Sequence, residues 1–243
     1  NMSIKNSKIR LHLDVSLSKG QETLFNKDQS HYLQKVMRLK IGDTINVFNG
    51  REGAWKVKIT EANKKFTLGV AIEQTQIQLN PPDVWLLFAP IKKNRTGLII
   101  EKATEMGIAR ILPVKTQFTN AERIKRQSLK AHAIEAAEQC NRTFVPSVDE
   151  LSDLETVLKN WPEDRGILYC DEFLHEKRVQ KPNSIFSSWA ILVGPEGGFS
   201  ERERAMLNSK KQVFPISLGP RILRADTAVV AALTFFQINF GDW

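Results

Sequence analysis

The sequence is poor in the residues that ligate metals and build disulfide frameworks. Among its 243 residues there are two cysteines, Cys140 and Cys170, and four histidines. The cysteines do not have the spacing of a metal site and the histidines are scattered, so we expect no metal centre. Two isolated cysteines build no disulfide framework, which favours a reducing compartment and predicts a cytoplasmic protein.

Long apolar runs are missing as well. A membrane-spanning helix needs about 20 consecutive apolar residues, and no stretch of this sequence comes close to that length. The N-terminal stretch NMSIKNSKIR lacks the apolar core of a signal peptide. The sequence therefore predicts a protein that does not engage a membrane.

Acidic residues are scarce in the first two thirds of the chain. The whole chain has a formal net charge of +8. Residues 1–73 hold 13 Lys and Arg against 7 Asp and Glu, and residues 92–142 hold 11 against 5. Residues 143–243 hold 11 against 14. A basic surface of this kind is typical of proteins that bind a polyanion, most often nucleic acid. A basic bias without any partner has the same composition, so charge alone leaves both interpretations open.

Short strand-like stretches at the start of the chain predict a small, barrel-like β-domain. IRLHLDV, DTINVFNG, AWKVKIT and KFTLGVAI follow one another, and Asn49-Gly50 marks a hairpin turn between two of them. One helical stretch, QSHYLQKVMRL, interrupts the strands. Its spacing places Leu33, Val36 and Met37 on one apolar face.

A domain boundary is expected at the polar stretch QTQIQLNPP, which has no periodicity and ends in two prolines. It divides the chain into a first domain of residues 1–73, a linker of residues 74–82 and a second domain of residues 83–243. In the second domain, buried strands such as VWLLFAPI, ARILPV, GILYC, WAILVG and VFPISLG alternate with amphipathic helices. This alternation is typical of an α/β domain with a parallel sheet.

Capping patterns predict where several helices of the second domain begin and end. A helix from about Thr96 to Met106 is closed by Gly107. In a capping box, the first side chain bonds a backbone N–H three residues later and the second side chain returns the bond. The pairs that match this pattern are Thr119 with Glu122, Ser152 with Glu155, and Ser200 with Glu203.

Three of the predicted strands end in unusual loops: Cys170-Asp171-Glu172, GPEGG at 194–198, and Gly219-Pro220-Arg221. The carboxyl ends of parallel strands lie on one edge of a sheet, where ligands bind. GPEGG lacks the Lys-Ser/Thr of a P-loop and the G-x-G-x-x-G spacing, and its proline removes a backbone donor that an anion would need. An adenosine moiety suits such a loop better than a phosphate, although a turn without any ligand remains open.

The last loop leads into an apolar helix, TAVVAALTFF, and places Arg221, Arg224 and Asp226 directly before it. Solvated arginines and a helix-capping aspartate would explain these residues without any function. A helix that is apolar nearly all round must be covered on all sides, and a second subunit is an expected cover.

Two segments together, GPEGGFSERER at 194–204 and LGPRILRADTAVVAAL at 218–233, resemble the RsmE family of SPOUT methyltransferases, which methylate N3 of a uridine in small-subunit ribosomal RNA. HYLQKVMRLKIGDTINVFNG resembles the PUA-like barrel of that family. Residues 93–107 resemble the start of its catalytic domain, and EAAEQCNRTFVP resembles its middle helix. The chain departs from the family pattern in two places, at KTQFTNAER and at Asp226, where the family has Thr-x-Arg-Ser and Glu.

The resemblance implies a SPOUT-type parallel sheet with a C-terminal trefoil knot, a PUA-like RNA-binding barrel over residues 1–73, and a homodimer. It implies that S-adenosylmethionine is the cofactor and that 16S ribosomal RNA, or the small ribosomal subunit, is the partner. The cofactor pocket is expected to comprise Leu168, Cys170, Asp171, Glu172, Gly194, Pro195, Glu196, Gly197, Gly198, Ile216, Leu218, Gly219 and Leu223.

For the chemistry we expect Arg224 to stabilise negative charge on the uracil, Asp226 to orient Arg224 or accept the N3 proton, and Arg221 to hold phosphate or base. The residues expected to contact RNA phosphates are Arg10, Lys35, Arg38, Arg51, Lys92, Lys93 and Arg95.

Three other functions remain open at this point. A SPOUT enzyme that methylates a ribose 2'-hydroxyl would share the pocket and the dimer. A non-catalytic, dimeric RNA-binding protein would bind no cofactor. A dinucleotide-dependent oxidoreductase is the weakest alternative, because no strand is followed by its Gly-rich fingerprint.

Overall fold

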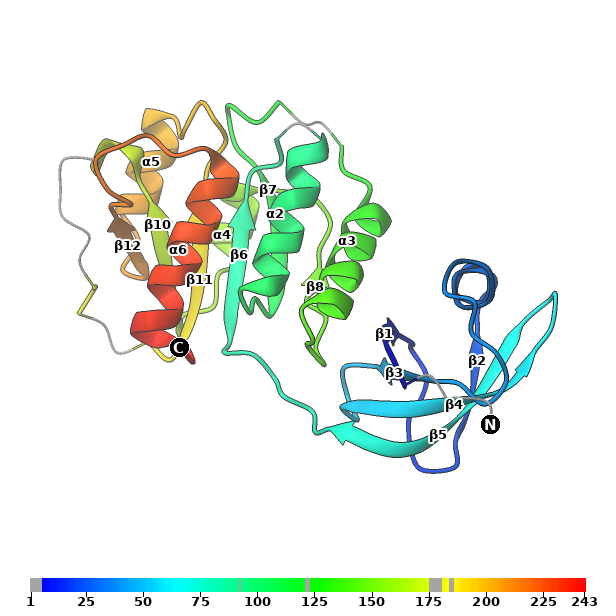
Figure 1. Ribbon diagram of the computed structural model, residues 1–243. Helices are drawn as coiled ribbons and strands as arrows, with labels where there is room; N and C mark the ends of the chain where they lie inside the picture. Colours follow the sequence, from blue (N-terminus) through cyan, green and yellow to red (C-terminus); the bar gives the residue numbers. More distant parts are fainter. Residues whose placement is uncertain (1–5, 92, 121–122, 175–180, 184–185) are drawn as a thin grey trace. The chain divides into compact units, whose positions relative to one another are not determined.

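The computed structural model describes residues 6–91, 93–120, 123–174, 181–183 and 186–243 (Figure 1). The chain divides into two compact units: residues up to Asn80 together with Ala137–Val145 form one, and Pro81–Ala136 with Pro146–Trp243 form the other. The segment 137–145 was expected in the second domain. It belongs to the first unit because Ala137 and Val145 pack against Phe48 and Ala54 of the β-domain.

The first unit is built on a five-stranded sheet with the order β1-β3-β4-β5-β2. β1 is parallel to β3, and the other neighbours are antiparallel. The strands are β1 (Asn6–His12), β2 (Glu22–Phe25), β3 (Thr44–Phe48), β4 (Ala54–Ala62) and β5 (Thr67–Gln76).

The hairpin turn expected at Asn49-Gly50 is confirmed between β3 and β4. The Asn49 side-chain oxygen accepts hydrogen bonds from the N–H groups of Arg51 (2.9 Å) and Glu52 (3.0 Å), which mimics a backbone turn. Gly50 has a φ of 82°, a conformation that glycine adopts without strain.

A short helix covers one end of this sheet. α1 (Lys27–His31) begins at a capping box of Asn26 and Gln29 and continues into a π-helical turn, η1 (Tyr32–Val36). The expected apolar face is wrong: Leu33 is fully buried, but Val36 and Met37 are 59% and 37% exposed. The π-turn accounts for Val36, because it has more residues per turn than an α-helix and rotates Val36 away from the face of Leu33. Met37 lies beyond η1, as its C-cap residue.

The second unit contains a seven-stranded sheet in which all pairs are parallel, with the order β12-β10-β11-β6-β7-β8 and β9 also paired to β7. The parallel α/β fold class is therefore confirmed. The strands are β6 (Val84–Phe88), β7 (Arg110–Lys115), β8 (Ser147–Val148), β9 (Ser152–Asp153), β10 (Arg165–Cys170), β11 (Ser188–Val193) and β12 (Val213–Ile216).

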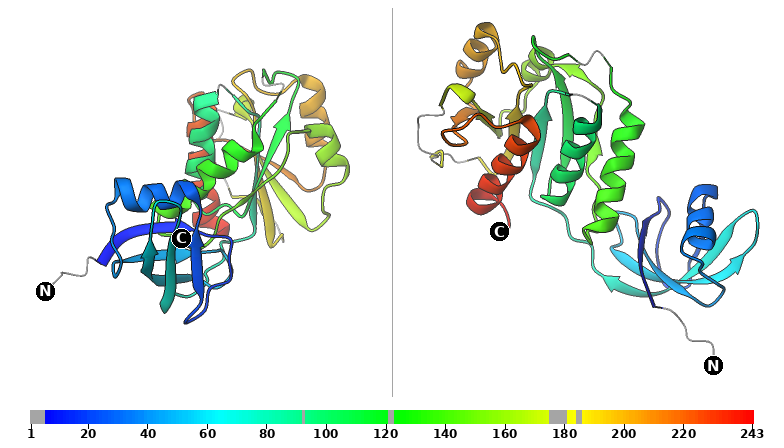
Figure 2. Two further views of the ribbon diagram at one scale, coloured as in Figure 1. Left: turned by 90° about the vertical axis from the view of Figure 1, so that its right-hand side faces the viewer. Right: turned by 45° about the horizontal axis from the view of Figure 1, so that its top comes forward.

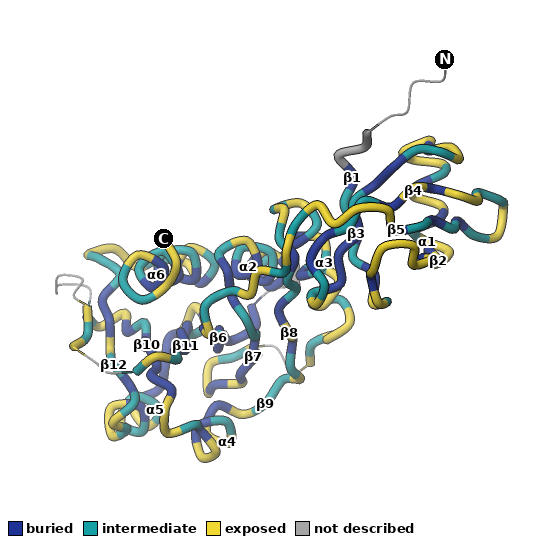
Figure 3. The backbone as a smooth tube through the Cα atoms, turned by 90° about the horizontal axis from the view of Figure 1, so that it is seen from below, coloured by how far each residue is buried: buried dark blue, intermediate teal, exposed yellow. Residues whose placement is uncertain are grey.

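Helices cover both faces of this sheet. α2 and α6 lie side by side on one face, and α4 and α5 lie on the other (Figure 1, Figure 2 and Figure 3). The helices are α2 (Lys93–Glu105), α3 (Arg126–Gln139), α4 (Leu154–Lys159), α5 (Glu201–Asn208) and α6 (Ala225–Phe240), with a 3-10 turn, η2 (Glu172–Leu174). No helix in the described part of the chain is both long and apolar enough to span a bilayer.

One of the three expected capping boxes is confirmed, that of Ser200 and Glu203 at the start of α5. The box expected at Ser152 is wrong, because Ser152 lies in β9, where it pairs with Val114 of β7. α4 instead begins after Asp153, which makes no side-chain cap.

The box expected at Thr119 is also wrong, since α3 begins at Arg126. The Thr119 hydroxyl bonds the hydroxyl of Thr116 at 2.8 Å and accepts from its N–H at 2.9 Å, which closes a turn after β7. Glu122, the expected second member, lies outside the described residues.

Candidate active site

Three loops meet at the carboxyl edge of the parallel sheet. They follow β10, β11 and β12, which are neighbours, so the strand ends lie side by side. The loops line one common cavity at this edge of the sheet. The expected cofactor residues that lie in its wall are Cys170, Asp171, Glu172, Gly194, Pro195, Glu196, Gly198, Leu218, Gly219 and Leu223.

Three expected cofactor residues are not in the wall. Leu168 and Ile216 are buried within their strands, with exposed fractions of 0% and 2%. Gly197 lies in the turn of the GPEGG loop, where an added Cβ would meet the Cβ of Phe118 at 3.1 Å. The wall also contains residues that sequence reasoning missed: Tyr169, Phe173, Val193, Phe199, Arg204, Ile222, Ala225 and Ala228.

Part of this missed wall has a signal in the sequence. A strand that ends at a cavity offers side chains from both of its faces, so Tyr169 belongs with its neighbour Cys170. Arg204 lies one helical turn after Ser200, at the end of α5 that the capping box places beside the loop. Phe173 and Ile222 follow no pattern that would have identified them.

Turn geometry and close packing inside the protein explain the glycines of the GPEGG loop. The Gly198 N–H donates to the Pro195 carbonyl at 2.9 Å, which closes a turn, and Gly198 has a φ of 68°. An added Cβ on Gly194 would meet the Phe199 ring at 2.6 Å, and one on Gly198 would overlap the Glu172 carboxylate. Turn geometry and close packing therefore both require glycine here, and they leave the backbone accessible at the cavity.

The loop after β10 is held rigidly. The N–H of Asp171 donates to the Ile216 carbonyl at 3.2 Å, and the Asp171 carboxylate accepts from the Phe173 N–H at 3.1 Å. The first bond ties the end of β10 to β12, and the second closes a turn within the loop. Burial raises the pKa of the neighbouring Cys170 thiol to about 12, so this side chain is a neutral part of the wall at physiological pH.

Charges of both signs surround the cavity. Asp171, Glu172 and Glu196 contribute carboxylates to the wall. Arg204 contributes a guanidinium, which is fixed by stacking on the Phe173 ring at 3.6 Å from its centroid. A ligand that carries both a positive and a negative group would find partners for each.

Asp226 forms a two-point ion pair with Arg95. The Arg95 guanidinium donates to the two carboxylate oxygens at 2.6 and 3.3 Å, joining the first turn of α2 to the first turn of α6. The carboxylate also accepts from the Thr227 N–H at 3.0 Å. The hydrogen bond from Arg95 lowers the pKa of Asp226 below its ordinary value, although burial opposes the shift.

This pairing changes the role expected for Asp226. Its hydrogen bonds go to Arg95 and Thr227, not to Arg224, and a carboxylate with a lowered pKa is a weak proton acceptor. Arg95, expected among the phosphate contacts, has an intramolecular partner. The pair instead fixes the start of α6 against α2.

The two other expected catalytic residues are exposed arginines of the same segment. Arg221 lies in the cavity wall. Arg224 lies outside it and is the N-cap residue of α6, where its carbonyl accepts from the Ala228 N–H at 2.7 Å. Its side chain makes no cap hydrogen bond, so the guanidinium is not used to begin the helix.

The residues expected to contact RNA differ in their surroundings. Lys35 and Arg38 are exposed. Arg51 pairs with Asp14 at 2.9 Å. Arg10 is half-buried: it donates to the Arg142 carbonyl at 2.7 Å and its guanidinium lies 5.1 Å from the centre of the Phe48 ring. Lys93 is the first residue of α2, and Lys92 lies outside the described residues.

The Arg95–Asp226 pair predicts a pH-dependent stability. Because the folded protein lowers the pKa of Asp226, this carboxylate stabilises the fold fully above its unfolded pKa, near 3.8. The stabilisation is lost as the pH falls through the lower folded value. We expect Asp226→Asn to be less stable than the parent protein at neutral pH, with a difference that shrinks below about pH 4.

Urea unfolding of both proteins across the acid range measures this difference. The control is Asp242→Asn, at an exposed position near the C-terminus, which should change neither the stability nor its pH dependence. A stability difference for Asp226→Asn that stays constant with pH would contradict the pairing.

Comparison with known proteins covers both units. Residues 78–237 match the model of an RNA methyltransferase domain, and residues 25–70 match that of an RNA methyltransferase PUA domain. Ribosomal RNA small subunit methyltransferase E of Rickettsia conorii is 32% identical over 231 residues, which cover 92% of this chain and 93% of the relative. The chain belongs to the RsmE family.

Solved structures related to this RsmE-family chain agree in fold. The crystal structure of a ribosomal RNA small subunit methyltransferase E from Neisseria gonorrhoeae, bound to S-adenosyl methionine, matches with a TM-score of 0.86 and 25% identity. The match covers 97% of this chain and 99% of the other. A Legionella pneumophila protein, in complex with the bound cofactor SAM, matches with a TM-score of 0.84 and 26% identity over 97% and 99%.

These matches confirm the family that was expected from GPEGGFSERER and LGPRILRADTAVVAAL. They also confirm the combination of an RNA methyltransferase PUA domain with a SPOUT-like parallel α/β domain. In the RsmE-family chain, the cavity at the ends of β10, β11 and β12 is therefore the candidate cofactor site.

Proposed function

We propose that this chain transfers the methyl group of S-adenosylmethionine to N3 of a specific uridine in 16S ribosomal RNA of the small subunit, in the cytoplasm. The observation that carries the proposal is the cavity at the edge of β10, β11 and β12, lined by the loops that bear the family's motifs. Two solved relatives with the same fold hold S-adenosylmethionine.

The cavity suits S-adenosylmethionine chemically. The cofactor has an apolar-faced adenine, a positive sulfonium and a methionine end with an amino and a carboxylate group. Val193, Phe199 and Ala228 offer apolar surface for the adenine. The wall carboxylates suit the positive groups, and Arg204 or Arg221 suits the carboxylate. Backbone N–H and C=O groups of the loops, at Gly194 to Gly198 and at Leu218-Gly219, can form hydrogen bonds with the adenine.

S-adenosylmethionine supplies a methyl group that its sulfonium charge has already activated. The work left to the protein is to place uracil N3 in line with that methyl group and to stabilise the charge that builds on O2 and O4 as the N3 proton leaves. We assign charge stabilisation to Arg224, the N-cap residue of α6, because the helix dipole at that end also favours negative charge. Arg221, in the wall, holds phosphate or base.

In this scheme Asp226 helps to position Arg224. Its pair with Arg95 holds the first turn of α6, and Arg224 directly precedes that turn. Asp226 is therefore a positioning residue, and the N3 proton passes to another acceptor. The shorter Asp226 side chain, in place of the family's Glu, still reaches both donors of Arg95.

RNA binding is proposed for the basic residues of the PUA domain and for the start of α2. Lys35 and Arg38, which are exposed, are the candidates best suited to phosphate contacts, while Arg10 is partly engaged by the protein. Such contacts would position the RNA without reading its sequence.

A homodimer is proposed because α6 has apolar residues on two sides. Its inner side, with Val229, Leu233 and Phe236, packs within the unit. On its outer side Phe235 is half-buried and Ile238 is 63% exposed. The trefoil knot is likewise proposed from the family.

We expect Ile238→Glu to weaken the dimer about tenfold or more, because a charge would be buried without a partner in the contact. Light scattering after size-exclusion chromatography at several concentrations measures the change. The matched control is Ile41→Glu, since Ile41 is also 63% exposed but belongs to the PUA domain. A mass that stays dimeric for Ile238→Glu would contradict this contact, and a monomeric parent protein would contradict the dimer.

The reaction is tested by incubating the protein with labelled S-adenosylmethionine and small-subunit RNA, or particles, from a strain that lacks the enzyme. Digestion and nucleoside analysis should recover label in 3-methyluridine. Label on a ribose would replace N3 methylation by 2'-O-methylation. Failure to bind S-adenosylmethionine at all would remove the enzyme function and favour a non-catalytic RNA-binding protein.

A further inference from the structure

Tyr169 carries a polar group that the fold of the protein does not use. It lies on β10, one residue before the strand ends, and is 0% exposed. Among the described residues its hydroxyl oxygen has no hydrogen-bond partner. Burying a hydroxyl without a partner is costly, and proteins rarely keep such a group without a use for it.

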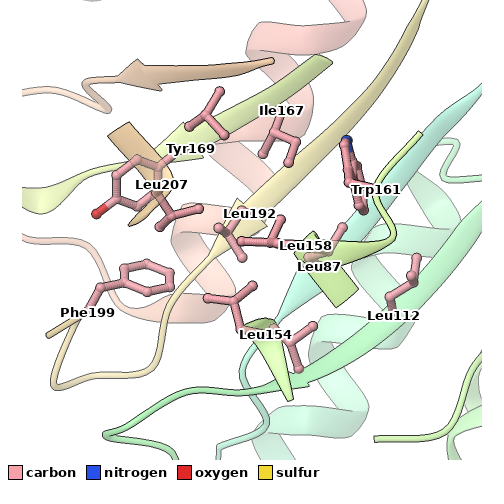
Figure 4. Packing of buried hydrophobic residues seen from close by; sticks show 13 residues of the cluster. Leu87, Leu112, Leu154, Leu158, Trp161, Ile167, Tyr169, Leu192, Phe199 and Leu207 are labelled. Carbon is pink, nitrogen blue, oxygen red and sulfur yellow. The ribbon is translucent and has the colours of Figure 1, made fainter. Parts of the chain in front are cut away.

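The tyrosine ring is held in place by its neighbours. It packs edge-on against Phe199, with ring centroids 5.1 Å apart and an interplanar angle of 82°. Leu192 and Leu207 belong to the same buried cluster. Figure 4 shows the hydroxyl oxygen at the margin of this cluster, on the side away from Leu192. The ring therefore cannot turn its hydroxyl out to water without breaking the packing.

Tyr169, which carries this hydroxyl, is part of the cavity wall. Tyr169 lines the cavity wall together with Asp171, Glu172 and Arg204. Burial and the nearby Asp171 carboxylate raise the pKa of Tyr169 far above its ordinary value, so the oxygen keeps its proton. The hydroxyl is therefore protonated at neutral pH and can donate a hydrogen bond.

We propose that the Tyr169 hydroxyl donates a hydrogen bond to an acceptor atom of bound S-adenosylmethionine, and that Tyr169 is therefore a cofactor-binding residue. The acceptor is the carboxylate or a ring nitrogen of the cofactor. This inference rests on the proposed function. The sequence suggested that backbone groups of the loops bind the cofactor, and the inference adds a contact from a side chain.

Two explanations of the buried hydroxyl make opposite predictions for Tyr169→Phe. If the cofactor is the partner, the hydroxyl is unsatisfied in the free protein, and its removal stabilises that form but weakens cofactor binding. If a protein group or a trapped water is the partner, its removal destabilises the free protein and leaves cofactor affinity unchanged.

The experiment compares the full-length parent protein with Tyr169→Phe by calorimetric titration with S-adenosylmethionine and by thermal unfolding with and without it. We expect the dissociation constant to rise about two- to tenfold. The Tm of the free protein should rise by about 2 to 4 °C, so that the Tm increase produced by the cofactor becomes smaller.

The matched control is Tyr32→Phe. Tyr32 is the other of the two tyrosines in the chain, belongs to the PUA domain and is 37% exposed. The Tm and the cofactor affinity of the Tyr32→Phe protein should both equal those of the parent protein.

An unchanged dissociation constant for Tyr169→Phe would overturn the inference while leaving the proposed function intact. Failure of the parent protein to bind S-adenosylmethionine would overturn both. Should Tyr169→Phe fold poorly, that result would itself show that the hydroxyl is needed within the protein, and would also overturn the inference.

Discussion

Replacing Arg224 by alanine is expected to lower the rate of methyl transfer by about 10²- to 10³-fold, the cost of removing one group that stabilises charge in a transition state. Affinity for S-adenosylmethionine should be nearly unchanged, because Arg224 lies outside the cavity wall. Helix α6 should be undisturbed, since the Arg224 side chain makes no cap hydrogen bond. Single-turnover methylation of the RNA and calorimetric titration with the cofactor measure the two quantities separately.

Arg202→Ala is the control for a general loss of positive charge. Arg202 lies on α5 with 82% of its side chain exposed, and it pairs with Glu155. Its replacement should leave the rate of methyl transfer almost unchanged. A rate for Arg224→Ala close to that of the parent protein would remove Arg224 from the mechanism and leave Arg221 as the remaining candidate.

Replacing Gly194 by alanine is expected to weaken S-adenosylmethionine binding about tenfold or more. The new Cβ would meet three atoms of the Phe199 ring at 2.6 to 3.1 Å. That ring is already packed against Tyr169, so it must move at a cost typical of overpacking, and its movement disturbs the cavity wall. Calorimetric titration of the full-length protein measures the loss.

A second substitution tests whether the ring is the cause. Phe199→Leu removes Cε2 and Cζ, the two atoms that the new Cβ would meet most closely, so Gly194→Ala should cost less affinity in that background than alone. The difference between the two costs is the coupling of the two positions. Equal costs in both backgrounds would contradict the steric explanation, and would mean that the ligand itself needs the space at Gly194.

Elements whose signals are local could be predicted from the sequence. Strands β6, β7, β10, β11 and β12 follow from continuous apolar runs, and the start of α5 follows from Ser200 and Glu203. The Asn49-Gly50 turn follows from residue chemistry alone. Each of these features depends on residues within a few positions of one another, so the sequence carries their full cause.

Local patterns failed where tertiary packing overrode them. Ser152 has the chemistry of an N-cap but pairs in β9, because β7 offers it a strand partner. Val36 has helical spacing but is exposed, because η1 is a π-turn. Segment 137–145 belongs with the PUA domain through its contacts, although it lies far along the chain from the other residues of that domain.

The sequence by itself determined the family, the parallel α/β domain and the three loops that had to meet at one edge of its sheet. Only the tertiary structure decided which side chains meet across that edge. Arg95 and Asp226 are 131 positions apart, and the sheet order and the packing of α2 on α6 bring them together. The buried hydroxyl of Tyr169 arises in the same way. Both depend on side-chain contacts between distant segments, and periodicity and turn chemistry, which act over a few residues, contain no information about such contacts.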